Sequence, residues 1–366
     1  MNIVILGLSN TSGRGDGHTA LYQPLMRELS QKGHHILFLK RERPGYGVVD
    51  ESLNTGFCET GHYYSLKDLQ LFTEQVHEAD MVILGSSVPE GVQVAEWVLR
   101  NARGVKAFYD LDTPVTLARL NSRACDYLNP DLIPQFDLYL SVMGGPALEV
   151  LERQYGSPMA RALYRSVDAT LFYPEFREKI WDLGYLADFT ESHQPLVDKL
   201  MLEAASDWSK GRFVVAGAQY PPDMPWPTNT KYTQQLQTAD HRKFYNSLRF
   251  ALHITGPEAL PGTYAPSASL LEAAACGTPI IANYWEGLED VLAIDSEILV
   301  SRSSKETIQY LREISKSERK LIGERARKKI LSRHTPARRA KELIGYAEEF
   351  LTLDGEPGAY NLEVVV

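Results

Sequence analysis

The chain has 366 residues, of which 44% are hydrophobic, and its formal net charge is −9. Its length exceeds what one ordinary core holds, which predicts two domains, and its apolar content excludes a disordered chain. The acidic balance disfavours a whole-chain nucleic-acid binder, and no apolar stretch approaches the roughly 18 to 20 residues of a membrane span.

The N-terminal run MNIVILGL has no basic start and no cleavage site, so it is interpreted as a first strand rather than a signal peptide. The three cysteines, Cys58, Cys125 and Cys276, are far apart and form no CxxC pair, which predicts a reducing compartment, the cytoplasm. The nine histidines show no metal-ligand spacing, so no metal site is expected.

Short apolar runs alternate with amphipathic helical patterns in the first half of the chain. The clearest helix is expected at residues 20–32, with Thr19 as its cap and Gly33 as its stop. This alternation predicts a parallel sheet with helices on both faces. The strands are expected at residues 2–8, 35–39, 81–85, 107–111 and 138–142. Ligands of such sheets bind outside the carboxyl ends of the strands.

The same alternation starts again in the second half, after a joint near residues 164–176. Helices are expected at 194–206 and 267–276, and a last helix at 337–351. The predicted domains are 1–172 and 173–335, followed by the helix at 336–353 and a tail at 354–366. The second set of strands is expected at residues 182–185, 212–216, 250–254, 279–283 and 298–300.

The first candidate site is the loop SGRGDGH, with glycines at 13, 15 and 17. It is neither the dinucleotide fingerprint nor a P-loop, because its first glycine does not directly follow the strand and no GK[ST] follows. A histidine at a helix start has a lowered pKa and can accept a proton, which makes His18 a candidate base. The alternative is a flexible surface loop.

Two more motifs end strands of the first domain. In YDLDTP, Asp112 is either a carboxylate aimed at an acceptor hydroxyl or the cap of the helix beginning at Pro114. In SVMGGP, Gly144 and Gly145 let the backbone approach a ligand or a neighbouring element.

The most informative stretch is APSASLLEAAACGTPIIANYWEGLED, residues 265–290. Ser267 is expected to cap a helix whose N-terminus attracts phosphate, and Glu272 to accept hydrogen bonds from a ribose diol. Trp285 and Glu286 follow the next strand. The alternative is a plain strand–helix unit in which the small residues only allow close packing.

Two further segments have open interpretations. The segment VAGAQYPPDMPWP stacks a base or forms a rigid connector. The basic segment 316–341 is expected to be a solvated helical face, with a polyanion or anionic membrane partner as the alternative.

Ordered motifs along residues 1–351 resemble one family, the CgeB-like (spore-maturation-protein-like) glycosyltransferases. These motifs include FYDLDTPVTL, LYLSVMGGPALEVLERQYG, FVVAGAQYP, HRKFYNSLRFALHIT and YAPSASLLEAAACGTPIIANYWEGL. The resemblance implies a GT-B α/β fold, with two Rossmann-like doubly wound domains facing an interdomain cleft and a last helix crossing back to the first. It also implies a metal-independent transfer from a nucleotide sugar, a UDP-sugar above all, bound by the C-terminal domain to a hydroxyl acceptor bound by the N-terminal one.

The resemblance assigns roles to residues one by one. Glu272 matches the donor-ribose glutamate, and Ser267 and Leu270 lie by the diphosphate. His18 and Asp112 border the reacting centre on the acceptor side. The remaining matches are the glycine loop after the first donor-domain strand (Gly184, Tyr185), the base contacts (Gln219, Tyr220), and the acceptor or cleft residues (Gly15, Gly17, Gly144, Gly145, Trp285, Glu286).

The chain departs from the family pattern at three arginines, which are replaced by His193, Gly256 and Ser269. Because arginine is the usual partner of phosphate, these changes bear on the donor-diphosphate site. Arg249, His193 and Lys243 are the possible substitutes. Tyr264 stands where related retaining enzymes carry a second glutamate.

Three functions follow from these observations. The first is a glycosyltransferase, either inverting with His18 or Asp112 as base, or retaining with no obligatory protein base. The second is a nucleotide-sugar-binding or scaffold protein that has lost turnover, which the missing arginines motivate. The third is a nucleotide-sugar epimerase. Glycan, lipid, protein and small-molecule acceptors stay open, and the acidic charge disfavours nucleic acid.

Overall fold

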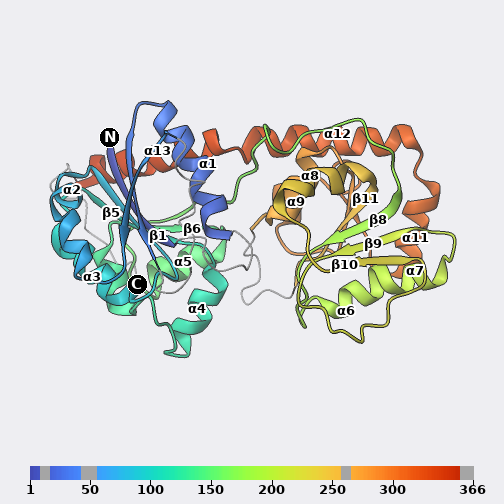
Figure 1. Ribbon diagram of the computed structural model, residues 1–366, viewed down its shortest axis with the longest axis horizontal. Coiled ribbons are helices and arrows are strands. Elements are labelled where there is room, and N and C mark those ends of the chain that lie inside the picture. The colour runs from blue at the N-terminus through green and yellow to red at the C-terminus, as the bar shows by residue number, and fades with distance from the viewer. Residues whose placement is uncertain (9–16, 43–55, 257–264, 355–366) are drawn as a thin grey trace, which may run out of the picture. The chain divides into compact units, whose positions relative to one another are not determined.

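The computed structural model describes residues 1–8, 17–42, 56–256 and 265–354. They form two compact units, one of residues 1–164 together with the segment from Pro336 onwards, the other of residues 165–335 (Figure 1). The units therefore divide eight residues before the expected position of 172, and the last helix belongs to the first unit.

The first unit is built on a seven-stranded parallel sheet with the strand order β3-β2-β1-β4-β5-β6-β7. The order reverses at β1, as in a doubly wound fold. Its strands are β1 Asn2–Leu8, β2 His35–Arg41, β3 Glu59–Tyr63, β4 Met81–Gly85, β5 Val105–Asp110, β6 Leu138–Ser141 and β7 Ala160–Ala162. Its helices are α1 Gly17–Gln31, η2 Asp68–Phe72, α2 Thr73–Glu78, α3 Gly91–Asn101, α4 Thr113–Asn121, η3 Pro130–Gln135, α5 Pro146–Arg153 and α13 Pro336–Asp354.

The second unit repeats this plan with six parallel strands in the order β10-β9-β8-β11-β12-β13. Its strands are β8 Trp181–Leu186, β9 Phe213–Ala216, β10 Thr230–Thr233, β11 Leu248–His253, β12 Ile280–Ala282 and β13 Leu299–Val300. Its helices are α6 Gln194–Val197, η4 Asp198–Leu202, α7 Glu203–Asp207, α8 Thr238–Ser247, α9 Ala268–Ala275, α10 Leu288–Val291, α11 Ser304–Glu313 and α12 Lys316–Arg333. Hence the predicted doubly wound α/β class is confirmed in both units.

Helices cover both faces of the second sheet. One core includes the buried residues of α8 and α9 with Ala326 and Ile330 of α12. The other includes the residues of α6, η4 and α7 with Leu311 of α11. Helix α12 packs closely on the end of α9: a Cβ at Gly323 would lie 2.1 Å from the carbonyl oxygen of Gly277. Gly323 therefore lets α12 approach the end of α9 closely.

Helix α13 packs beside α1 within the first unit (Figure 1). Ala340, Leu343 and Ala347 are its fully buried positions, and this i, i+3, i+7 spacing is one face of a helix. Helix α1 begins at Gly17, three residues before its expected start, so Thr19 lies inside it. No helix in the described part of the chain is both long and apolar enough to cross a membrane.

Candidate functional site

The N-terminus of α9 stands at the carboxyl edge of the second sheet, where β11 and β12 end. Ser267 is the residue before the helix, and its Oγ accepts a hydrogen bond from the backbone N–H of Leu270 at 3.2 Å. The same Oγ lies 3.1 Å from Ser269 Oγ and 3.5 Å from His253 Nδ1. Thus α9 carries the serine cap that the sequence predicts, while the Leu270 side chain is fully buried in the core.

His253, the last residue of β11, connects this helix start to the neighbouring loops. Its Nε2 lies 3.1 Å from Thr255 Oγ1, and its ring meets the ring of Trp285 edge-on, with the centroids 5.3 Å apart. Burial, aided by the nearby His193, lowers the pKa of His253 to about 3, so the ring is neutral at physiological pH. Glu286, which follows Trp285, is exposed.

The loops after β11 and β12 are tied together by a pair of hydrogen bonds. The backbone N–H of Thr255 donates to Asn283 Oδ1, and Asn283 Nδ2 donates to the Thr255 carbonyl, both at 2.9 Å. Because each loop continues a neighbouring parallel strand, this pair holds the carboxyl edge in one arrangement. Residues 257–264, including Tyr264, lie outside the described residues.

His193 comes to the same edge from the segment before α6. Its Nδ1 lies 3.5 Å from Tyr185 Oη, and its ring packs against Gly256 so closely that a Cβ there would be 2.8 Å from its Cδ2. The positions of the three replaced arginines, 193, 256 and 269, are therefore brought together. The α9 cluster is the set Tyr185, His193, His253, Thr255, Gly256, Ser267, Ser269, Asn283 and Trp285.

Glu272 lies one turn into α9 and is mostly buried, with 13% of its side chain exposed. Its Oε2 is 2.9 Å from Nδ1 of His241, on α8. This contact fixes the carboxylate at one position. The α9 cluster contains no lysine or arginine, so backbone dipoles, hydroxyl groups and imidazoles are its polar groups.

Two of the three possible arginine substitutes lie outside the α9 cluster. Arg249 is the second residue of β11, at the amino edge of the sheet, where it pairs with Asp182 and donates to the Leu311 carbonyl at 2.9 Å. Lys243 pairs with Asp240 at 2.7 Å on α8. Arg249 is thus a structural residue opposite the α9 cluster, and only His193 belongs to that cluster.

Gly184 and Tyr185 do not form a loop, because both lie within β8. A Cβ at Gly184 would be 2.5 Å from Leu248, so this glycine makes room for the core rather than for a ligand. Tyr185 is buried and reaches the α9 cluster through its hydroxyl.

The expected base contacts follow β9. Gln219 is exposed and has a left-handed φ of 67°. Tyr220 is 8% exposed, and its hydroxyl donates to the Ala187 carbonyl at 3.2 Å. Its ring packs against an aromatic group in which Trp226 and Tyr232 stack, with centroids 5.0 Å apart. An aromatic surface thus borders the carboxyl ends of β9 and β10.

In the first unit, Asp110 and Asp112 have different environments. Asp110 is fully buried and accepts hydrogen bonds from Thr116 Oγ1 at 2.7 Å and Tyr139 Oη at 2.8 Å. Burial raises its pKa to about 6. Asp112 is exposed at the start of α4, and its side chain makes no capping hydrogen bond. The capping role proposed as the alternative for Asp112 is therefore wrong.

The glycines predicted as site residues in the first unit have different structural roles. Gly144 is a packing glycine, since a Cβ there would lie 1.9 Å from Tyr164 Oη. Gly145 precedes α5 with φ 74° and ψ −150°, a conformation essentially restricted to glycine. Gly17 is the first residue of α1 and His18 the second. The side chain of His18, like the whole of Gly15, lies outside the described residues.

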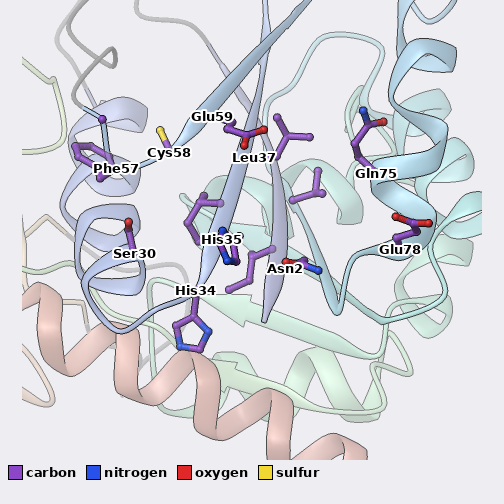
Figure 2. A pocket seen from close by; sticks show the side chains of 14 residues that line it. Asn2, Ser30, His34, His35, Leu37, Phe57, Cys58, Glu59, Gln75 and Glu78 are labelled. Atoms are coloured by element: carbon purple, nitrogen blue, oxygen red, sulfur yellow. The ribbon is translucent and has the colours of Figure 1, made fainter.

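A pocket of about 590 Å³ opens in the first unit, at the amino ends of β1, β2 and β3 (Figure 2). His34, His35, Cys58 and Glu59 are among its lining residues. None of the predicted site residues lines it, and it lies at the sheet edge opposite Asp110. Among the described residues, no three His, Cys, Asp or Glu side chains come close enough together to hold a metal ion.

Three residues of the α9 cluster, His253, Thr255 and Asn283, were not among the sequence candidates. They lie at or beside the carboxyl ends of the predicted strands 250–254 and 279–283, and that position is the signal that points to them. A family profile described as glycosyl transferase-like matches residues 193–345, which contain these three residues and most of the α9 cluster. No curated protein sequence matches the chain significantly.

Solved structures match nearly the whole chain at low sequence identity. Sucrose-phosphate synthase from Thermosynechococcus elongatus has a TM-score of 0.66 at 14% identity, covering 96% of this chain and 99% of its own. Anabaena Alr3699/HepE in complex with UDP and glucose has a TM-score of 0.67 at 12% identity, covering 95% and 100%. An alpha-glucosyltransferase in complex with UDP-glucose and DNA has a TM-score of 0.70 at 14% identity, covering 95% and 99%.

Proposed function

We propose that this chain, which has the fold of the GT-B glycosyltransferases, moves a sugar from a nucleoside diphosphate to a hydroxyl acceptor. One observation carries the proposal: residues 193, 256 and 269, distant in sequence, converge at the serine-capped start of α9 inside the glycosyl transferase-like segment. The second unit binds the donor there, and the first unit binds the acceptor.

The donor diphosphate is bound at the start of α9. The first-turn amides and the helix dipole place partial positive charge at this end, where negative charge builds up as the leaving group departs. The bond between the sugar's anomeric carbon and the phosphate oxygen breaks, and a bond to the acceptor oxygen forms. These backbone groups let the reaction proceed without a metal ion.

Glu272 accepts hydrogen bonds from the donor ribose, and His241 holds its carboxylate in place. The aromatic group around Tyr220 provides the stacking surface for the base. UDP is the proposed nucleotide, because the solved structures that resemble this chain include complexes with UDP and UDP-glucose. The ordered motifs support a finer assignment to the CgeB-like group.

On the acceptor side, Asp112 is the proposed base if the transfer inverts the anomeric centre. Its carboxylate is exposed at the carboxyl edge of the first sheet, at the start of α4. His18 is the second candidate for that base. If the transfer retains the configuration, the acceptor proton passes to the leaving phosphate and neither residue is required as a base.

A nucleotide-sugar-binding protein without turnover is the second candidate function. It is favoured by the composition of the α9 cluster, where the family's three arginines are replaced by uncharged or weakly basic residues. Donor binding without transfer or hydrolysis identifies it.

The first test is thermal unfolding of the purified protein with a panel of nucleoside diphosphates and nucleotide sugars. A ligand that binds only the folded state and is present at about 100 times its Kd raises the free energy of unfolding by about 2.7 kcal/mol. We expect a selective rise in Tm with one nucleotide, lost in Glu272→Ala and kept in the control Glu203→Ala, an exposed carboxylate of α7. An unchanged Tm with every nucleotide contradicts the donor site, and an equal rise in Glu272→Ala contradicts the ribose contact.

A further inference from the structure

His193 occupies a position that is defined by its contact with Gly256. A Cβ on Gly256 would lie 2.8 Å from Cδ2 and 3.0 Å from Nε2 of the imidazole. Any larger residue at 256 would displace the ring. The glycine at 256 therefore makes room for the histidine at 193. The edge of the ring that carries Nε2 and Cδ2 therefore faces Gly256, in the loop after β11.

The groups that face His193 come from three elements. Tyr185 of β8 approaches Nδ1 through its hydroxyl at 3.5 Å, and the neutral His253 of β11 lies nearby. From its own segment, Glu191 and Ser192 precede it in the chain, and both are exposed. No lysine or arginine from the described part of these elements contacts the ring. A charge on the imidazole therefore has no fixed protein partner in the α9 cluster.

We propose that His193 supplies the cationic contact to the donor diphosphate in its protonated form, so that donor binding takes up a proton from the solvent. This inference rests on the proposed function and identifies the group that replaces the arginines. In the free protein, burial lowers the pKa of His193, so the ring is mostly neutral at pH 7.5. A phosphate oxygen beside Nε2 favours the charged form and raises that pKa.

The proton balance fixes the pH dependence. The proton enters with the nucleotide, stays on Nε2 while the phosphate is bound and returns to solvent when the nucleoside diphosphate leaves. Binding must therefore weaken as the pH rises from the pKa of His193 in the free protein to its higher pKa in the complex, by at most a factor of ten per pH unit, and then stay constant. An arginine at 193 would remove this dependence, because a guanidinium stays charged.

The test is calorimetry of UDP binding at pH 7.5 in two buffers of different ionisation enthalpy, such as HEPES and Tris. We expect the wild type to take up a substantial fraction of one proton per UDP, and His193→Gln to take up none and to bind more weakly. His193→Arg should bind UDP without proton uptake and with the same affinity at pH 6.5 and 8.5. His35→Gln, an exposed histidine of the first unit, is the control and should behave as the wild type.

Thermal unfolding without ligand verifies that each variant is folded. If the wild type binds UDP with no proton uptake, or if His193→Gln takes up as many protons as the wild type, the proposal for His193 is overturned while the donor site stands. If the wild type binds no nucleoside diphosphate at either pH, the proposed function itself fails, and the proposal for His193 fails with it.

Discussion

The buried imidazole of His253 should make the second unit sensitive to acid. The ring is 6% exposed and has the hydroxyls of Thr255 and Ser267 and the Trp285 ring as neighbours, none of which carries a negative charge. Its pKa in the folded state is about 3, against 6.5 for an ordinary histidine. Below pH 6.5 the unfolded chain binds a proton that the folded chain excludes, so acid favours unfolding.

The magnitude follows from the two pKa values. Above pH 6.5 the residue has almost no effect, because both states are neutral. Below it, the free energy of unfolding falls by about 1.4 kcal/mol per pH unit until the folded ring titrates near pH 3. Between pH 6.0 and 4.5 the loss attributable to His253 is about 2 kcal/mol.

The assay is urea unfolding of the wild type and His253→Gln, followed by tryptophan fluorescence at several pH values in this range. Glutamine keeps a polar group at the end of β11 but does not titrate. The wild type should lose about 2 kcal/mol more than the variant between pH 6.0 and 4.5. Parallel pH curves for the two proteins would refute the reasoning, because they would show that the ring is protonated as easily in the folded state as in the unfolded one.

Three further outcomes are expected. Gly323→Ala should destabilise the second unit by about 1 to 3 kcal/mol, because the new methyl group meets the Gly277 carbonyl. Gly345→Ala, with open space around its Cβ in α13, should stabilise the first unit by up to about 1 kcal/mol. Denaturant midpoints of the two variants and the wild type measure both effects. In the wild type, the free energy of unfolding of the first unit should fall by about 2 kcal/mol from pH 4.5 to 7, because the raised pKa of Asp110 makes its ionisation unfavourable in the folded state. Asp110→Asn should remove this decrease, and equal slopes in both proteins would contradict the prediction. Ser267→Ala should lower the stability of the second unit by about 1 kcal/mol and weaken UDP binding, and Ser267→Asp, which keeps a capping oxygen, should restore the stability but not the binding of an anion.

Interior strands were predictable because burial on both faces requires continuous apolar runs. The strands missing from the prediction, β3, β7 and β10, all stand at sheet edges. Their sequences, ETGHY, ARA and TKYT, carry no apolar run. An edge strand pairs on one side only and is less enclosed, so its residues need not be hydrophobic. For that reason the apolar pattern does not reveal it.

The candidate site was predictable in part. The cap at Ser267 and the start of α9 followed from local residue types, which act within one helical turn. Arg249 was predicted to lie at the donor-diphosphate site, although its position just before the predicted strand 250–254 already indicates the amino edge of the sheet. The contact of His193 with Gly256 was beyond sequence reasoning, because it depends on how two loops that follow different strands meet.

The membership of α13 in the first unit has a consequence for the order of events during synthesis. Residues 165–335 form an uninterrupted segment that is complete before α13 leaves the ribosome, whereas the first unit begins with residue 1 and is completed only by a helix translated after its neighbour. Until then, the surface of α1 that packs against α13 is bare. The second unit, which carries the candidate donor site, is thus fully synthesised before the first unit is complete.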